Sequence, residues 1–248
     1  MGLEGKVAVV FGAGGSMGGA IACAFGEAGA GVVLAGRTLG PLETVAEAIR
    51  AGGGLAETGV VDVDDAEAVK RYVDELVGRN GRVDVSCNAV GMDDVQNIPL
   101  VDLALDDFMI SIDQAMRRHF VTATVAARQM STQGSGAIVM LTASAAREWR
   151  HVMGGFSIAC GAIETFARTL AAEVGKDGVR VVCIRANFTP ETYPGVTEAD
   201  IRPLVDDTMI GRLPRLAEVG AAAAYAASDS AGATTGVVLD LTCGAIVD

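Results

Sequence analysis

The chain has 248 residues, of which half are apolar, 32 are glycine and few are aromatic. Its 19 basic and 31 acidic residues give a formal net charge of -12, which repels a phosphate backbone and argues against nucleic acid as a partner. The length fits one large α/β domain over residues 1–248, and no apolar run approaches the roughly 20 residues of a membrane span. Because the N-terminus lacks the apolar core of a signal peptide, we expect a soluble, cytoplasmic protein without a membrane partner.

Five cysteines lie far apart within apolar runs: Cys23, Cys87, Cys160, Cys183 and Cys243. No CxxC pair is present, and no histidine stands near a cysteine at the spacing of metal ligands. We therefore expect reduced, buried thiols and no bound metal.

The first half of the chain alternates apolar runs with helical patterns. Residues 7–11 form a continuous apolar run, the glycine-rich stretch 12–19 follows, and an apolar helix pattern continues to residue 28. Further strands are predicted at residues 32–35, 55–61 and 83–87, with helices at 39–51 and 66–79. Glycines let a backbone approach a pyrophosphate, and a helix N-terminus offers it free N–H groups. The beginning of the chain thus predicts a dinucleotide site.

The second half continues the alternation. Helices are predicted at residues 106–130, 154–175 and 218–227, strands at 138–141, 179–184 and 236–241, and an irregular segment precedes the last helix. Strands separated by helices of ten or more residues imply parallel pairing through right-handed crossovers. The predicted fold class is α/β, a doubly wound, mostly parallel seven-stranded sheet of Rossmann type with helices on both faces.

Taken in this order, the segments resemble the short-chain dehydrogenase/reductase family over essentially the whole chain. The family's TGxxxGxG turn corresponds to residues 11–18, where its first and last glycines survive and its threonine is Phe11. Residues 88–91 stand where the family has NNAG, and Thr235-Gly236 resembles the start of its closing strand. The resemblance implies a small-molecule substrate, a nicotinamide cofactor and a homodimer or homotetramer.

The resemblance also implies which residues hold the cofactor. They are Gly12, Gly15, Ser16, Met17, Gly18, Arg37, Asp62, Val63, Asn88, Ala89 and Thr189. Family members that prefer NAD place an acid just after the second strand, whereas an arginine there can pair with the 2′-phosphate of NADP. Arg37 therefore favours NADP(H) over NAD(H), although a solvated loop charge is the alternative interpretation of this residue.

The catalytic positions of the family have lost their chemistry. Its Asn, Ser, Tyr and Lys fall on Ala115, Ala143, Phe156 and Cys160. In the family the tyrosine transfers the proton, the lysine lowers its pKa, the serine holds the carbonyl oxygen and the asparagine anchors a water. A phenyl ring has no proton to donate, so ordinary carbonyl reduction by this mechanism is excluded to first order.

Several polar residues are candidate substitutes. Arg185, at the end of the sixth strand, could bring positive charge to the nicotinamide or pair with a carboxylate at the strand end. His151 and Glu148 lie before the helix at 154 and could supply acid–base chemistry, while Tyr193 lies on the segment that forms the family's substrate lid. His119 follows Ala115 by one turn and could face the site or a subunit contact. Ser144 could replace the serine only if the loop slipped by one residue, and Cys160 could be a nucleophile only with a lowered pKa.

Three functional hypotheses remain open. The first is an atypical NADP(H)-dependent oxidoreductase that reduces an activated C=N, C=C or C=O bond without a tyrosine acid. The second is a catalytically inactive pseudoenzyme that binds the cofactor or serves as a structural partner. The third is a non-redox lyase or isomerase on the same scaffold.

Overall fold

The inner strands of the sheet coincide with largely apolar runs whose side chains are buried on both faces, whereas the two edge strands are partly exposed. In the computed structural model, which describes residues 2–247, the first strand is β1 (Val7–Phe11). Its residues Val9 and Phe11 join one hydrophobic cluster, and Ala8 and Val10 join a second cluster across the sheet. Alternate side chains of a strand point to opposite faces, so a strand that is covered twice must be apolar throughout.

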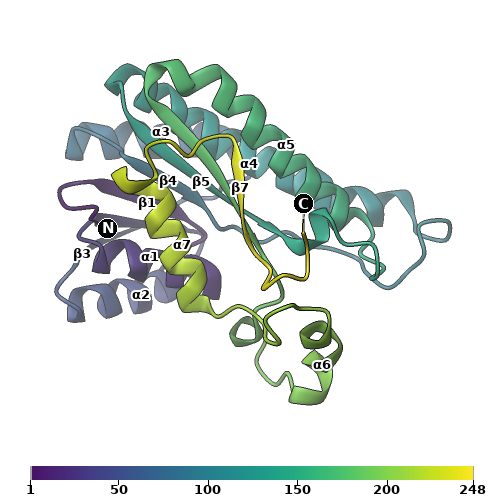
Figure 1. Ribbon diagram of the computed structural model, residues 1–248. Coiled ribbons are helices and arrows are strands. Elements are labelled where there is room, and N and C mark those ends of the chain that lie inside the picture. The colour runs from purple at the N-terminus through teal and green to yellow at the C-terminus, as the bar shows by residue number, and fades with distance from the viewer. Residues whose placement is uncertain (1, 248) are drawn as a thin grey trace.

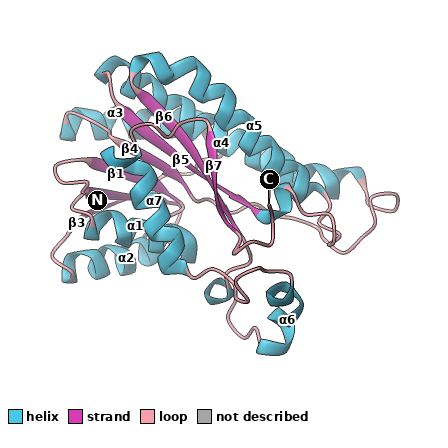
Figure 2. Ribbon diagram, in the orientation of Figure 1, coloured by secondary structure: helices cyan, strands magenta, loops and turns pink. Residues whose placement is uncertain are grey.

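Seven strands form one sheet among the described residues (Figure 1; Figure 2). After β1 they are β2 (Gly31–Gly36), β3 (Leu55–Val60), β4 (Val85–Asn88), β5 (Gly136–Ala143), β6 (Val179–Ala186) and β7 (Val237–Leu241). Their order is β3-β2-β1-β4-β5-β6-β7, and every neighbouring pair is parallel. The predicted doubly wound parallel sheet is confirmed. The strand order reverses between β1 and β4, which is where open parallel sheets bind ligands.

Helices cover both faces of the sheet (Figure 1). They are α1 (Ser16–Glu27), α2 (Leu39–Ala51), α3 (Ala66–Asn80), α4 (Leu105–Gln133), α5 (Gly155–Val174), α6 (Glu198–Asp206) and α7 (Leu216–Ala227). Helices α1, α2 and α7 pack on one hydrophobic cluster, while α3, α4 and α5 pack on the other. Within residues 2–247, no helix combines the length and the apolar character needed to cross a membrane.

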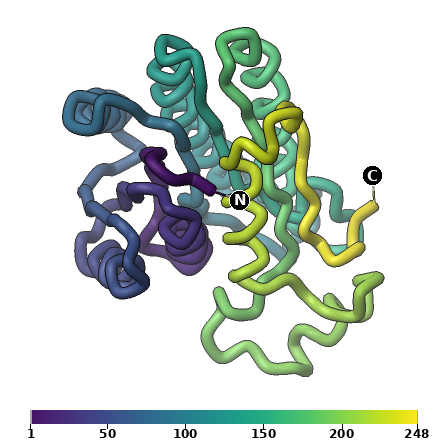
Figure 3. The backbone as a smooth tube through the Cα atoms, turned by 60° about the vertical axis from the view of Figure 1, so that its left-hand side comes forward, coloured from purple at the N-terminus to yellow at the C-terminus, as the bar shows by residue number. Residues whose placement is uncertain are grey.

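The segment between β6 and α7 contains a helix where the sequence indicated only irregular structure. Helix α6 lies away from the layered body in the green part of Figures 1 and 3. It begins with a capping box, in which the Thr197 side chain accepts from the Asp200 N–H and the Asp200 carboxylate accepts from the Thr197 N–H. The expectation of an irregular segment was therefore wrong, and this short polar motif was the signal that could have revealed the helix.

The N-terminus of α5 touches α4 so closely that only glycine fits. A Cβ on Gly155 would lie 1.9 Å from the Phe108 carbonyl oxygen, a backbone atom that cannot swing aside. A Cβ on Gly161, six residues further along α5, would meet nothing within 4 Å. The two glycines therefore offer a matched pair for testing this contact.

We expect Gly155→Ala to lower the free energy of unfolding by about 1–3 kcal/mol, because overpacking forces the backbone of α4 or α5 to shift. Gly161→Ala should raise it by roughly 0.5–1 kcal/mol through helix propensity alone. Urea denaturation of the two variants checks this. Equal effects of the two substitutions would contradict the close approach of α5 to α4.

Candidate functional site

A glycine turn joins β1 to α1 at the reversal point of the sheet. Gly12 has a left-handed φ of 82°, and a Cβ there would lie 2.7 Å from the Ala89 carbonyl oxygen. A Cβ on Gly18 would lie 2.2 Å from the Gly12 carbonyl oxygen. Both positions thus require glycine for steric reasons as well as for any ligand.

The same turn has the features of an anion site. Gly15 precedes α1 without a side-chain cap, and Gly14, Gly15 and Ser16 are exposed. A surface hollow of about 610 Å³ lies beside them, lined also by Pro41 and Thr44 of α2. Uncapped N–H groups at a helix N-terminus attract phosphate, so these residues fit the pyrophosphate of a dinucleotide.

The ends of β2, β3 and β4 bring the other predicted cofactor residues to the same edge. Gly36 pairs with Val60, so the exposed Arg37 lies beside the segment that carries Asp62 and Val63. The Asn88 amide donates to the Arg118 carbonyl oxygen at 3.1 Å and to the Thr122 hydroxyl at 2.8 Å, and its own oxygen accepts from the Val90 N–H. The Ala89 N–H donates to the Phe11 carbonyl oxygen. Asn88 therefore fixes the β4 end against α4.

The four positions that the family resemblance assigns to catalysis lie on α4 (Ala115), at the end of β5 (Ala143) and in the first turns of α5 (Phe156 and Cys160). Ala115 and Cys160 are buried, and Ala143 and Phe156 are partly buried. The Thr142 hydroxyl donates to the Cys160 carbonyl oxygen at 3.2 Å, which places the ends of β5 and α5 together. Burial raises the pKa of the Cys160 thiol to about 11, so this side chain is a neutral apolar group at physiological pH. The condition for a nucleophilic Cys160, a lowered pKa, is not met.

All five cysteines are free thiols. Cys87, Cys160 and Cys183 are buried, as expected from their apolar surroundings. Cys23 and Cys243 are only partly buried, so the expectation of burial was wrong for these two. Within residues 2–247, no three His, Cys, Asp or Glu side chains are grouped to hold a metal ion.

Ser144 lies directly beyond the last paired residue of β5. Ala143 pairs with Ala186 without a slip, and the Ser144 hydroxyl donates to the Asn187 side-chain oxygen at 3.2 Å. Asn187 in turn donates to the Thr242 carbonyl oxygen at 3.4 Å. Two polar side chains therefore connect the ends of β5 and β6 next to the Ala143 position.

Arg185 is buried in a network of opposite charges. Its side chain is 1% exposed, and its Nε and Nη2 atoms each donate to a Glu164 carboxylate oxygen at 2.9 Å. Its Nη1 atom donates to Asp240 at 3.0 Å. These contacts agree with the interpretation that Arg185 pairs with carboxylates, and they weigh against Arg185 as a positive charge beside the nicotinamide. They join α5, β6 and β7 behind the catalytic positions.

The loop before α5 uses its own charges to hold its shape. The Glu148 carboxylate accepts from the backbone N–H groups of Trp149 and Arg150 and from the Arg150 side chain. Arg150 also approaches Asp207, at the end of α6, at 3.4 Å. His151 is exposed, and its Nε2 lies 3.9 Å from the same carboxylate. Glu148 is thus engaged within its loop, whereas His151 faces the segment after β6.

Tyr193 and Thr189 belong to the segment that follows β6. The Tyr193 ring stacks on Phe188 with centroids 4.5 Å apart, and it is 56% exposed. Thr189 is buried, and its hydroxyl donates to the Asn187 carbonyl oxygen. Tyr193 is therefore held at the surface by an aromatic contact.

His119 is buried in the protein, on α4. It is 3% exposed, and among the described residues its Nδ1 atom has no hydrogen-bond partner. Burial lowers its pKa from the ordinary 6.5 to about 4, so the ring is neutral at physiological pH. A contact of His119 with a second subunit is not needed to explain its burial.

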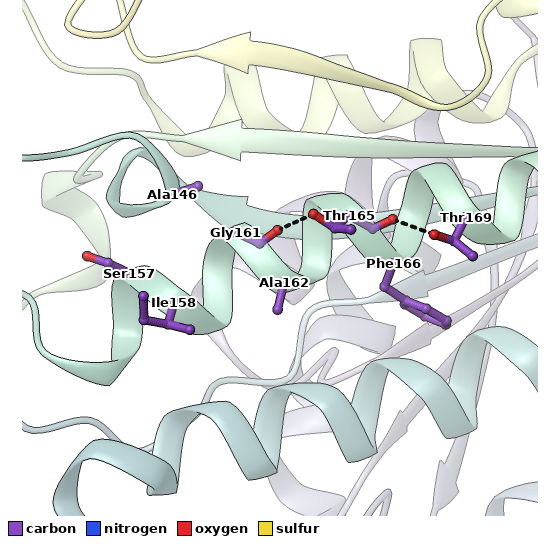
Figure 4. Close-up of a pocket in the computed structure, with 8 residues that line it drawn as sticks. All are labelled: Ala146, Ser157, Ile158, Gly161, Ala162, Thr165, Phe166 and Thr169. Atoms are coloured by element: carbon purple, nitrogen blue, oxygen red, sulfur yellow. Dashed lines mark hydrogen bonds between the residues drawn. The ribbon is translucent and has the colours of Figure 1, made fainter.

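A shallow apolar hollow lies along the outer side of α5, and the turn after β5 contributes Ala146 to its lining (Figure 4). Ile158, Ala162 and Phe166 project from α5 toward the neighbouring helix in this view. The Phe166 ring lies 6.0 Å from that of Phe120 on α4. This surface belongs to the α4–α5 pair and does not include the catalytic positions.

The comparisons with known proteins agree with this geometry. Residues 12–245 match the family model described as enoyl-(acyl carrier protein) reductase. The chain is 32% identical over 241 residues to the short-chain reductase protein NovJ of Streptomyces niveus, covering 93% of this chain and 90% of that protein. The chain belongs to the short-chain dehydrogenase/reductase family of oxidoreductases.

Two solved structures of the family contain a nucleotide. NAD+-bound xylitol dehydrogenase is 25% identical, with a TM-score of 0.87 over 96% of this chain and 98% of that one. A gluconate 5-dehydrogenase from Burkholderia cenocepacia, in complex with NADP and tartrate, is 24% identical, with a TM-score of 0.90 over 98% and 96%. Relatives in this family bind nicotinamide dinucleotides of both kinds.

We expect Arg185→Met to lower the free energy of unfolding by about 3–5 kcal/mol, because it leaves the buried Glu164 carboxylate without its partner. The double variant Arg185→Met/Glu164→Gln should lose clearly less, since no buried charge is then unpaired. The exposed Arg168→Met on α5 serves as the control and should change stability by about 0.5 kcal/mol or less. Urea denaturation measures all three. A double variant as unstable as Arg185→Met would contradict this role.

We expect His119 to destabilise the fold in mild acid. The unfolded chain binds a proton near pH 6.5 and the folded chain near pH 4, so stability falls by up to about 3 kcal/mol as the pH is lowered through this interval. His119→Phe should remove this part of the pH dependence. His151→Phe, the same change at the chain's other histidine, should retain it. Urea unfolding between pH 4 and 7 tests the pair, and an unchanged slope in His119→Phe would disprove the assignment.

Proposed function

We propose that the protein binds NADP(H) at the carboxyl edge of the sheet and reduces an activated C=N, C=C or C=O bond of a small molecule. The observation that carries the cofactor assignment is the glycine turn, where Gly12 and Gly18 bring backbone against backbone and leave the N-terminus of α1 uncapped. Bound there, the cofactor would supply the hydride. The residues proposed to hold it are Gly12, Gly15, Ser16, Met17, Gly18, Arg37, Asp62, Val63, Asn88, Ala89 and Thr189.

Arg37 supports the preference for NADP(H). It is exposed, directly after β2, at the edge that adjoins the glycine turn through the hydrogen bonds of Gly12 and Ala13 to the Ala35 carbonyl oxygen. A guanidinium at this place offers a charge-assisted hydrogen bond to a 2′-phosphate, whereas the ribose hydroxyls of NAD favour a carboxylate.

An activated substrate fits the catalytic positions best. Ala143, Phe156 and the neutral thiol of Cys160 cannot donate a proton efficiently, so the proton must come from water, from the substrate or from a side chain at the rim. The description of the matching family model names an enoyl reductase, and a C=C bond conjugated to a carbonyl is a substrate of this kind. His151, oriented toward Asp207, is the candidate proton donor at the rim, and Tyr193 is the second candidate.

A pseudoenzyme is the second candidate function. It is supported by the lack of a proton donor at the positions assigned to catalysis, because a buried Cys160 and its apolar neighbours leave these positions without acid–base chemistry. In that case the protein would bind the dinucleotide without turning over a substrate.

Self-association is part of the proposal. Phe120 and Ile158 are exposed on α4 and α5, and together with Phe166 they form an apolar surface that a second copy would bury. A cytoplasmic homodimer or homotetramer is the assembly that we propose.

We expect NADPH to bind more tightly than NADH, and Arg37→Met to raise the Kd for NADPH about tenfold, since a hydrogen bond to a charged group is worth about 1.5–3 kcal/mol. Arg71→Met, an exposed arginine on α3, is the control and should leave both Kd values unchanged. Nucleotide fluorescence titration measures them. If neither dinucleotide binds at millimolar concentration, the oxidoreductase proposal loses its basis.

A panel of ketones, imines and enones separates the two candidate functions. With NADPH bound, imines and enones should be consumed faster than simple ketones, because they need less help from an acid. Binding of NADPH without oxidation by any member of the panel favours the pseudoenzyme.

A further inference from the structure

Arg118 is a buried arginine on α4 that connects two loops of the proposed nucleotide site. Its Nε and Nη2 atoms donate to the two carboxylate oxygens of Asp64 at 2.7 and 2.8 Å. Its Nη1 atom donates to the Gly91 carbonyl oxygen at 2.6 Å and to Gln114 at 3.2 Å. The guanidinium therefore joins the loop after β3 to the loop after β4.

Two further polar side chains on the same face of α4 also bind the loop after β4. Gln114, one turn before Arg118, accepts from the Asp93 N–H and donates to the Asp93 carboxylate. The Ser111 hydroxyl, a further turn back, donates to the Asp93 carbonyl oxygen. Because residues three and four apart share one side of a helix, these side chains form a continuous row along the loop after β4. Arg118 is the only charged member of this row.

Asp64 binds Arg118 and lies on the segment that leaves the sheet beside the one that carries Arg37. The Val61 N–H donates to the Gly36 carbonyl oxygen, so the segments that follow β2 and β3 begin side by side. Arg37 lies on the segment after β2, and Asp64 lies on the segment after β3. The Arg118 hydrogen bonds hold the pKa of Asp64 below its ordinary value, and the positive charge of Arg37 contributes in the same direction. The carboxylate of Asp64 is thus within electrostatic reach of both arginines.

We propose that Arg118 is a positioning residue that determines nucleotide specificity. By binding both oxygens of Asp64, it keeps this acid from pairing with Arg37 and leaves the Arg37 guanidinium available for a 2′-phosphate. Without Arg118, the Asp64 carboxylate is an unpaired negative charge beside Arg37, which attracts the guanidinium and repels the phosphate. This inference rests on the proposed binding of NADP(H).

A bridge with a purely structural role has a different signature. If Arg118 only stiffened the two loops, its loss would weaken NADPH and NADH to the same extent, because both share the adenosine and the pyrophosphate. In that case, removing the Asp64 charge would restore the affinity for neither nucleotide. The ratio of the two Kd values therefore separates specificity from simple support.

The experiment compares wild type, Arg118→Met and the double variant Arg118→Met/Asp64→Asn by fluorescence titration with NADPH and NADH. We expect Arg118→Met to raise the Kd for NADPH roughly tenfold and that for NADH by about twofold at most, in line with the loss of one charged hydrogen bond. The double variant should recover the ratio of the wild type. Equal weakening of both nucleotides, or no recovery in the double variant, overturns the inference.

Arg118→Lys covers the case in which Arg118→Met does not fold. Lysine keeps the charge but not the bidentate geometry, so the ratio should change less than in Arg118→Met, and Asp64→Asn added to it should restore the ratio fully. A ratio that Asp64→Asn leaves unchanged in the Arg118→Lys background also overturns the inference.

A measurement without nucleotide separates this inference from the function on which it rests. If the wild type binds neither dinucleotide, the proposed function fails. The contact itself is then judged by NMR titration of the Asp64 carboxyl group in Arg118→Met and in Arg118→Met/Arg37→Met. A higher Asp64 pKa in the second variant supports pairing with Arg37, and identical values in the two variants overturn it.

Discussion

The close approach of backbone to backbone at the glycine turn is the constraint on which the rest of the site depends. Gly12 lies against the Ala89 carbonyl oxygen, and Gly18 lies against that of Gly12. With side chains at either position, α1 could not start so near the sheet, and β1 and β4 could not end side by side. The reversal of strand order occurs at this point, so the same contacts that allow the fold also create the crevice. Phe11 and Ser16, which replace typical residues of the motif, leave this geometry intact.

The two halves of the carboxyl edge differ in their chemistry. The half next to β2, β3 and β4 is rich in directed polar contacts, with Asn88 bound to α4 and Arg118 bound to Asp64. In the half next to β5 and α5, the positions that the family resemblance assigns to catalysis hold methyl, phenyl and thiol groups, and the buried charges of Arg185 and Glu164 pair with each other. Nucleotide binding requires the first half, whereas proton transfer requires the second.

Much of the fold could be predicted from sequence because the inner strands are buried on both faces and therefore appear as largely apolar runs. The glycine turn and the Asn88 position could be placed for the same reason, since each directly follows such a run. Helix α6 was missed because it is short, contains Pro203 and has no buried residue, which leaves no apolar periodicity to detect. The partners of Arg118 and Arg185 could not be predicted either. Asp64 lies 54 positions from Arg118, and only the packed sheet brings such residues together.

The burial of Arg185 bears on the interpretation that Cys160 stands where the family has its catalytic lysine. Position 160 lies one turn before Glu164 on α5, and the Glu164 carboxylate already pairs with Arg185. There the chain has a thiol that burial keeps neutral, and the Glu164 charge is satisfied from β6. The positive charge in this region therefore belongs to the framework of the sheet. In the proposed function, the proton that reaches a substrate here therefore comes from the rim or from solvent.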